Sequence, residues 1–114
     1  MNKDIQNYIM KYSNEIQKLF YELRMLILQS ASHNIEEKLW ARIPSYYNGK
    51  RFIRLIPFKD HINIEASAII ENKNKLQEFK ITPKDMLQIY YNQAIPTDIL
   101  QIIFKDTLSE ILDK

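Results

Sequence analysis

Three side chains that could do chemistry lie within the segment RFIRLIPFKDHINIEA, residues 51–66: Arg54, His61 and Glu65. An imidazole titrates near neutral pH and can serve as an acid, a base or a metal ligand. A carboxylate can act as a general base or bind a hard cation, and a guanidinium binds carboxylates and phosphates. Whether these groups can act together depends on the face that each one occupies.

The segment alternates apolar and polar residues on both sides of Lys59-Asp60, which is typical of two half-buried strands joined by a tight turn. Opposed residues of antiparallel strands share one face of a sheet. The pairs expected on the core face are Pro57 with Ile62, Leu55 with Ile64, and Ile53 with Ala66. The pairs expected on the other face are Phe58 with His61, Ile56 with Asn63, and Arg54 with Glu65.

The preceding turn, in SYYNGKR, decides which residues join that second face. Its Asn-Gly dipeptide favours a two-residue hairpin, but that register places Arg42 opposite Leu55 and buries a charge. A three-residue loop over 47–49, with the glycine in the left-handed conformation, pairs Ile43 with Ile53 instead. We expect this second register, because a one-residue slip moves every side chain to the opposite face.

The predicted outer face is rich in aromatic residues. Its members are Trp40, Arg42, Pro44, Phe52, Arg54, Ile56, Phe58, His61, Asn63 and Glu65, joined by Gln88 and Tyr90 if Leu87 and Ile89 point inward. Exposed patches of this kind mark interaction sites. The residues expected to form a ligand or partner surface are Trp40, Arg42, Pro44, Arg54, Phe58, His61, Glu65 and Tyr90. Two alternatives stay open: the C-terminal segment could cover this face, or a homodimer could bury it.

Other chemistry is also open. His61 with Glu65 or Glu37 could perform acid-base catalysis, and the same three residues are the candidate metal ligands. Arg54 opposite Glu65 also fits a simple cross-strand ion pair. The mixture of aromatic and basic residues in YYNGKRFIR is compatible with single-stranded nucleic acid. One glycine in the whole chain excludes a Gly-rich phosphate loop.

The elements that must position these residues follow from hydrophobic periodicity. Helices are expected over 3–12, 14–30, 67–79 and 97–112, with Ser13 and Thr97 as N-caps, and strands over 36–44, 51–58, 61–66 and 86–91. The order ααβββαβα predicts an α+β fold with two layers, in which helices pack on one face of a mostly antiparallel four-stranded sheet. We expect a single domain, residues 1–114.

Composition narrows the classes of function. A net charge of only +2 argues against a nucleic-acid partner, because such proteins concentrate Lys and Arg. The polar start MNKDIQNYIMKY has no signal-peptide pattern, and no apolar run is long enough to span a bilayer. The chain has no cysteine, so it forms no disulfide and no thiolate metal site. We expect a cytoplasmic protein without a membrane partner.

Three segments, in the same order along the chain, resemble those of a known family. YIMKYSNEIQKLFYELRMLI is similar to its N-terminal helices, EEKLWARIPSYYNGKRFIRLIPFKDHINIEA to its Glu-to-Pro segment, glycine turn and F-K-x-H-I strand, and MLQIYYNQAIPTDILQII to its closing strand, I-P turn and helix. The family is the YdhG-like family of small bacterial domains of unknown function. The residues on its motif positions are Glu37, Pro44, Gly49, Phe58, Lys59, His61 and Pro96.

Some YdhG-like proteins are described as frataxin-like iron chaperones. The resemblance therefore implies iron as the ligand and intracellular iron delivery as the function. Together with the outer sheet face, it leads us to expect a cytoplasmic binding domain rather than an enzyme, one that contacts a partner protein, a ligand or a second copy of itself.

Overall fold

The computed structural model describes residues 1–31 and 34–109. Its elements in chain order are α1 (Lys3–Ile9), α2 (Asn14–Gln29), β1 (Glu36–Trp40), β2 (Ile43–Asn48), β3 (Arg51–Pro57), β4 (His61–Ala66), the 3-10 helix η1 (Ser67–Lys75), β5 (Lys80–Ile81), β6 (Leu87–Tyr90) and α3 (Thr97–Leu108). In this part of the chain the strands form one six-stranded sheet in the order β1-β2-β3-β4-β6-β5. All neighbouring strands are antiparallel.

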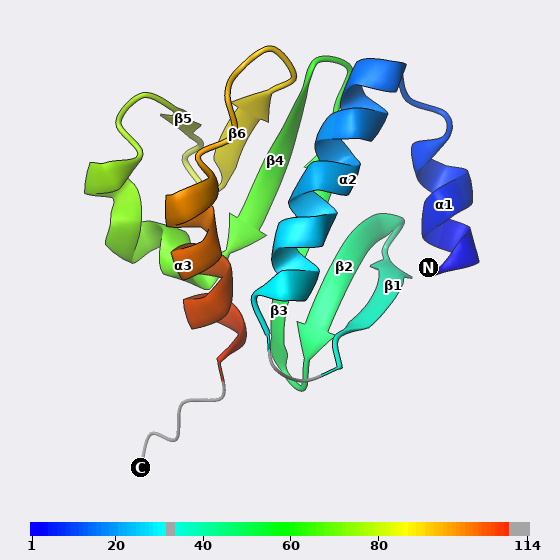
Figure 1. The fold of residues 1–114 in the computed structure, drawn as a ribbon, viewed down its shortest axis with the longest axis horizontal. Helices are drawn as coiled ribbons and strands as arrows, with labels where there is room; N and C mark the ends of the chain where they lie inside the picture. Colours follow the sequence, from blue (N-terminus) through cyan, green and yellow to red (C-terminus); the bar gives the residue numbers. More distant parts are fainter. Residues whose placement is uncertain (32–33, 110–114) are drawn as a thin grey trace.

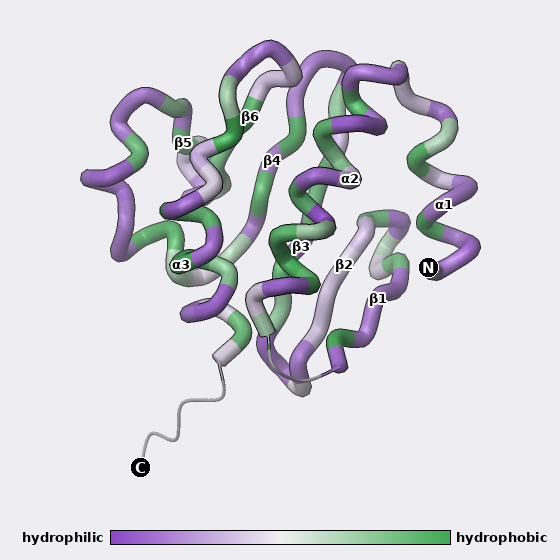
Figure 2. The backbone as a smooth tube through the Cα atoms, in the orientation of Figure 1, coloured by the Kyte–Doolittle hydropathy of each residue, from purple (hydrophilic) through white to green (hydrophobic). Residues whose placement is uncertain are grey.

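The three α-helices lie across one face of the sheet (Figure 1). The core lies between these helices and the sheet, and hydrophobic and hydrophilic residues alternate along α2 and α3 (Figure 2). The largest fully buried side chains are Tyr46, Phe20, Phe104, Ile5, Ile9, Ile16, Leu23, Ile27, Ile53, Leu55, Ile62 and Ile64. The predicted α+β arrangement, with helices on one face of an antiparallel sheet, is confirmed.

α2 forms as its sequence predicts. The side chain of Ser13 accepts a hydrogen bond from the amide of Ile16 (3.2 Å), which satisfies a free N–H in the first turn. The apolar residues at helical spacing are all buried: Ile16, Leu19, Phe20, Leu23, Leu26 and Ile27. α1 is shorter than predicted and ends at Ile9.

The β3–β4 hairpin has the predicted register. Arg54 lies opposite Glu65, and Leu55 lies opposite Ile64. The amide of Phe58 donates to the carbonyl of His61 (2.8 Å) across the turn. The apolar partners therefore face the helices, and the polar partners face the opposite side.

The segment expected to be one strand, 36–44, is two strands, which corrects the predicted strand count. A tight turn at Ala41 and Arg42 separates β1 from β2, and these residues have φ of 50° and 66°. Two positive φ angles are the signature of a type I′ hairpin turn, whose twist matches that of the flanking strands. No glycine or asparagine marks this turn, so the sequence gives no direct signal for it.

The predicted three-residue loop over 47–49 is also wrong. Asn48 pairs with Arg51, so the turn consists of Gly49 and Lys50, with Gly49 at a φ of 63°. Tyr46, and not Ile43, lies opposite Ile53 on the core face. Arg42 is not buried in this register either, because it lies in the turn between β1 and β2 and not in a strand.

Three smaller differences concern the second half of the chain. The helix predicted over 67–79 is a 3-10 helix that ends at Lys75 and contains a kink at Asn72. A two-residue strand, β5, lies between the predicted helix 67–79 and the predicted strand 86–91, and it pairs with β6. Pro96 rather than Thr97 precedes the first turn of α3, and no side chain caps it. The predicted continuation of this helix through Ile111 and Leu112 lies outside the described residues.

Within residues 1–31 and 34–109, no helix is long and apolar enough to cross a membrane.

Candidate functional site

The candidate site is the outer face of the sheet, the face opposite α1, α2 and α3 (Figure 1). The strand registers place the following residues on it: Glu36, Lys38, Trp40, Ile43, Ser45, Tyr47, Phe52, Arg54, Ile56, His61, Asn63, Glu65, Gln88 and Tyr90. Side chains on neighbouring strands of one face are close enough to interact. Two aromatic clusters form here, one around Arg54 and one around His61.

Arg54 is the centre of the first cluster. Its Cζ lies 4.0 Å from the ring centre of Trp40 and 3.8 Å from that of Phe52. A guanidinium this close to two aromatic rings gains cation–π attraction and a large contact area. Only 8% of Arg54 is exposed. The two rings therefore shield this cation from solvent.

The three nitrogens of the Arg54 guanidinium contact polar side chains. Nε of Arg54 donates to Oγ of Ser45 (3.2 Å), and one terminal nitrogen donates to the hydroxyl of Tyr47 (3.2 Å). The other terminal nitrogen lies 3.6 Å from Oε1 of Glu65. Ser45 in turn donates to the carbonyl of Ile43 (2.9 Å). A buried charge that is paired and hydrogen-bonded in this way keeps one fixed position.

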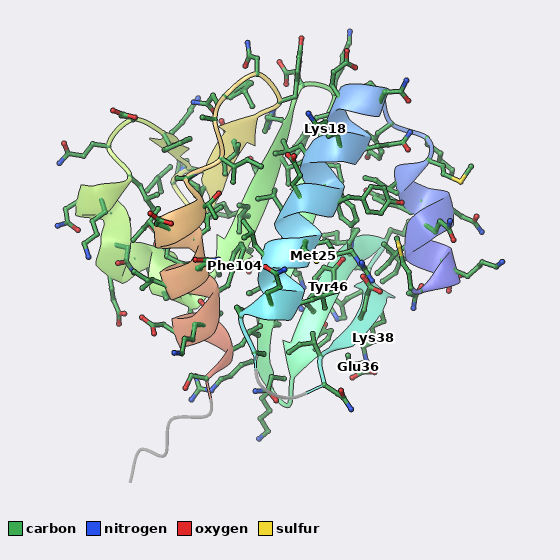
Figure 3. All side chains as sticks on the ribbon, viewed as in Figure 1. Lys18, Met25, Glu36, Lys38, Tyr46 and Phe104 are labelled. Carbon is green, nitrogen blue, oxygen red and sulfur yellow. The ribbon has the colours of Figure 1, made fainter. Side chains whose placement is uncertain are left out.

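Trp40 combines fixed geometry with exposure. Its ring packs on Arg54, yet 49% of the residue is exposed. β1 is an edge strand, and Glu36 and Lys38 project from it at the border of the molecule (Figure 3). A large apolar ring is thus presented at this edge with little freedom to move.

His61 is the centre of the second cluster. Its ring stacks on Phe58 at 4.6 Å between centres with an interplanar angle of 14°, and the ring of Tyr90 lies 4.9 Å away. Nδ1 of His61 lies 2.8 Å from Oδ1 of Asp60. Phe58 is 41% exposed. This cluster presents a second aromatic surface next to the turn between β3 and β4.

Asn63 lies between the two clusters, opposite Ile56 and Gln88. It is 8% exposed, and its Oδ1 has no hydrogen-bond donor among the described residues. A buried acceptor without a donor costs about 1–3 kcal/mol. The centre of the outer face therefore holds an acceptor whose hydrogen-bonding capacity is free.

Of the eight residues predicted for this surface, six lie on it or at its rim: Trp40, Arg54, Phe58, His61, Glu65 and Tyr90. Two do not. Arg42 occupies the turn between β1 and β2, and Pro44 is buried on the helix-facing side, because it alternates with Ser45 and lies opposite Leu39. Both corrections follow from the turn at 41–42.

Glu37 also lies on the helix-facing side, which corrects its predicted role. Arg24 of α2 donates to both of its carboxylate oxygens, at 2.5 and 3.2 Å, and the amide of Asn2 donates to Oε1 at 3.1 Å. Burial raises the pKa of Glu37, but the hydrogen bonds from Arg24 and Asn2 lower it more, so the net pKa is below its usual value. This carboxylate is committed to an ion pair between α2 and β1.

The predicted metal ligands are therefore not brought together. Glu37 is on one face of the sheet, and His61 and Glu65 are on the other. Within the described ranges, no group of three His, Cys, Asp or Glu residues is placed to hold a metal ion.

Ser45 and Tyr47 are members of the site that were not predicted. The predicted register placed Ser45 on the core face, and the predicted loop over 47–49 contained Tyr47. The sequence SYYNGKRF could have indicated them, because a serine, two tyrosines and a phenylalanine flank its two basic residues. A two-residue turn at Gly49 and Lys50 would have brought them opposite Arg54 and Phe52.

Two hollows lie elsewhere. A groove of about 600 Å³ runs between α2 and the segment before α3, beside Lys18 and Met25 (Figure 3). A smaller hollow of about 340 Å³ lies at the end of the sheet where β3 begins. His61 lines neither of them.

Comparisons of the chain with protein-family models, with curated proteins and with solved structures found no match.

Proposed function

We propose that the chain is a binding domain that contacts a partner protein through the outer face of its sheet, with Trp40 as the anchor. The observation that carries this proposal is the combination of exposure and fixed geometry at one ring. Trp40 is 49% exposed, while the guanidinium beneath it is 8% exposed and hydrogen-bonded. Residues that dominate binding energy are enriched in Trp, Tyr and Arg, and an anchor that is already ordered loses little entropy on binding.

The surroundings of Trp40 support a partner with acidic groups around an apolar centre. Arg42 and Lys59 follow the exposed rings of Trp40 and Phe58 in the chain. Within the described residues, neither of these two cations forms an ion pair. Complementary charge at the rim of an interface speeds association and selects the partner.

The proposed contact with a partner protein requires neither iron nor catalysis. Iron is the cargo that the family resemblance implies, but the described residues bring no three metal-binding side chains together. Catalysis by His61 has little geometric support, because Phe58 and Tyr90 pack against its ring. The proposed location is the cytoplasm, in line with a sequence that contains no cysteine.

A photo-crosslinking amino acid in place of Lys38 tests the proposal. Lys38 lies on the outer face of β1 and is exposed, so a bound partner would lie within reach. The same reporter is placed in a Trp40→Ala background and in a matched Met25→Ala background, since Met25 is 51% exposed on the helix side. We expect an adduct with one protein that is lost in the Trp40 background and kept in the Met25 background.

The purified partner then provides the quantitative test. We expect Trp40→Ala to weaken its Kd by more than about tenfold, and Met25→Ala to leave it unchanged. An adduct that joins two copies of this chain would replace the proposed partner with a homodimer. Equal loss of the adduct in both backgrounds would remove the outer face from the proposal.

A further inference from the structure

A second feature is the hollow of about 340 Å³ at the end of the sheet, which is lined in part by Phe52 of the Arg54 cluster. Segments far apart in the chain meet there: the β2–β3 turn, the start of η1, the turn before β6 and the end of α3. The residues that line it are Lys50, Arg51, Phe52, Glu65, Ala66, Ser67, Ile70, Lys84, Asp85 and Thr107. Its volume is within the range of small-molecule sites.

The charges that remain available in this hollow are positive. Asp85 is paired with Lys73 (2.7 Å), and Glu65 is paired with Arg54 (3.6 Å), so both carboxylates already have a cation outside the lining. The cations of the lining are Lys50, Arg51 and Lys84, and none of them forms an ion pair with residues 1–31 or 34–109. Three cations that form no ion pair among the described residues, around one hollow, favour an anion of more than a single charge.

The rest of the lining suits an organic group and hydrogen-bond acceptors. Phe52 and Ile70 supply apolar wall, and Ile70 is 56% exposed, which is unusual for a large apolar side chain. Thr107 is only 2% exposed, and its Oγ1 accepts from the amide of Ala68 (3.1 Å), which fixes this hydroxyl at the wall. The hollow thus has a cationic side and an apolar side.

We propose that this hollow binds a small phosphate monoester that carries a flat or apolar organic group, such as a nucleoside monophosphate. A phosphate monoester carries close to two negative charges at neutral pH, whereas a carboxylate carries one. The guanidinium of Arg51 offers a planar pair of donors to phosphate oxygens, and Lys50 and Lys84 offer point charges. The organic group would lie against Phe52 and Ile70. This site shares Phe52 and Glu65 with the outer face, but Trp40 does not line it.

Titration of the ¹⁵N-labelled full-length chain with AMP, adenosine and inorganic phosphate tests this inference. With AMP, we expect amide shifts that saturate and that cluster at Lys50, Ala66, Ser67 and Lys84. We expect inorganic phosphate to bind more weakly at the same amides, because it lacks the organic group. Adenosine alone should cause no saturable change, because it has no charge to pair with the cations.

Variants separate the hollow from general surface charge. Lys84→Gln should weaken the Kd for AMP by about tenfold, because a hydrogen bond to a charged group is lost. Lys11→Gln, which removes an exposed cation in the segment after α1, should leave the Kd unchanged. Equal effects of Lys84→Gln and Lys11→Gln would overturn the inference, as would equal affinities for AMP and adenosine. Absence of any shift at about 10 mM AMP would also overturn the inference, since the Kd would then lie above the millimolar range.

Discussion

The carboxylate of Glu37 and the guanidinium of Arg24 form a two-pronged ion pair, with hydrogen bonds of 2.5 and 3.2 Å, that joins β1 to α2. Their side chains are 10% and 18% exposed. The amide of Asn2 adds a third hydrogen bond and brings the start of α1 to the same carboxylate. The charge that sequence analysis assigned to a metal thus holds two helices on the sheet.

The first prediction concerns this ion pair. Glu37→Gln should lower the free energy of unfolding at pH 7 by about 2 kcal/mol, because the half-buried Arg24 loses its counter-charge. Glu36→Gln on the same strand removes only an exposed pair with Lys38, so it should cost less than about 1 kcal/mol. Urea denaturation measures both. Equal losses in the two variants would contradict the role assigned to Glu37.

The second prediction is the pH dependence of that difference. The pKa of Glu37 is lowered in the folded state by Arg24 and Asn2, in spite of the opposing effect of burial. A lowered pKa gives stability that is fully present above the pKa of the unfolded chain and is lost as the pH falls through that of the folded chain. The difference between the wild type and Glu37→Gln should therefore be constant near neutral pH and shrink in acid. A difference that grows on acidification would show that the carboxylate is not held ionised.

The third prediction uses the single tryptophan as a reporter. Arg54→Ala should destabilise the chain by about 2 kcal/mol, because Ser45, Tyr47 and Glu65 lose their shared partner. It should also shift the fluorescence of Trp40 to longer wavelength and increase quenching by acrylamide, because the ring loses its support. Lys105→Ala, on the exposed side of α3, is the control and should change neither signal. Unchanged quenching in Arg54→Ala would mean that other contacts fix the ring.

The fourth prediction concerns Tyr46, which lies on the helix-facing side of β2 (Figure 3). It is fully buried, and its hydroxyl has no hydrogen-bond partner among the described residues. Burial raises the pKa of this phenol well above its usual value, with a further contribution from Glu37 nearby. Tyr46→Phe should therefore change the free energy of unfolding by less than about 0.5 kcal/mol, or increase it. A loss above about 1 kcal/mol would reveal a hydrogen bond to Glu37 or Arg24.

The fifth prediction concerns the two turns. Arg42→Gly should stabilise the chain slightly, by about 0.5 kcal/mol, because relief of the left-handed conformation exceeds the entropy cost of glycine. Gly49→Ala should destabilise it by about 1 kcal/mol for the converse reason. Thermal denaturation of both variants gives the comparison. The same sign for both substitutions would contradict the turn assignment.

The parts of the fold that sequence analysis predicted correctly depend on local patterns. The stripe from Ile16 to Ile27 and the cap at Ser13 are sufficient for α2, because helix periodicity and capping act within a few residues. The β3–β4 register follows from two alternating runs around one short turn, since any other register would bury polar residues.

The strands before Arg51 were predicted wrongly because the turn that separates the first two has no sequence signal. Ala41 and Arg42 have low preference for positive φ, so nothing in the sequence marks the end of β1. The chain turns back after Trp40, which places Pro44 on the helix side and Ser45 and Tyr47 on the outer face. The site was therefore found in outline, while its hydrogen-bond network was not.

β1 closes one end of the sheet, and Asn2 donates to the main-chain carbonyl of Glu37 on that strand (3.0 Å). The start of α1 thus occupies an acceptor that a strand from another molecule would otherwise use. Unpaired strand edges are templates for aggregation. Loss of Asn2 would expose this acceptor and leave the outer edge of β1 more open to pairing with a strand from another molecule.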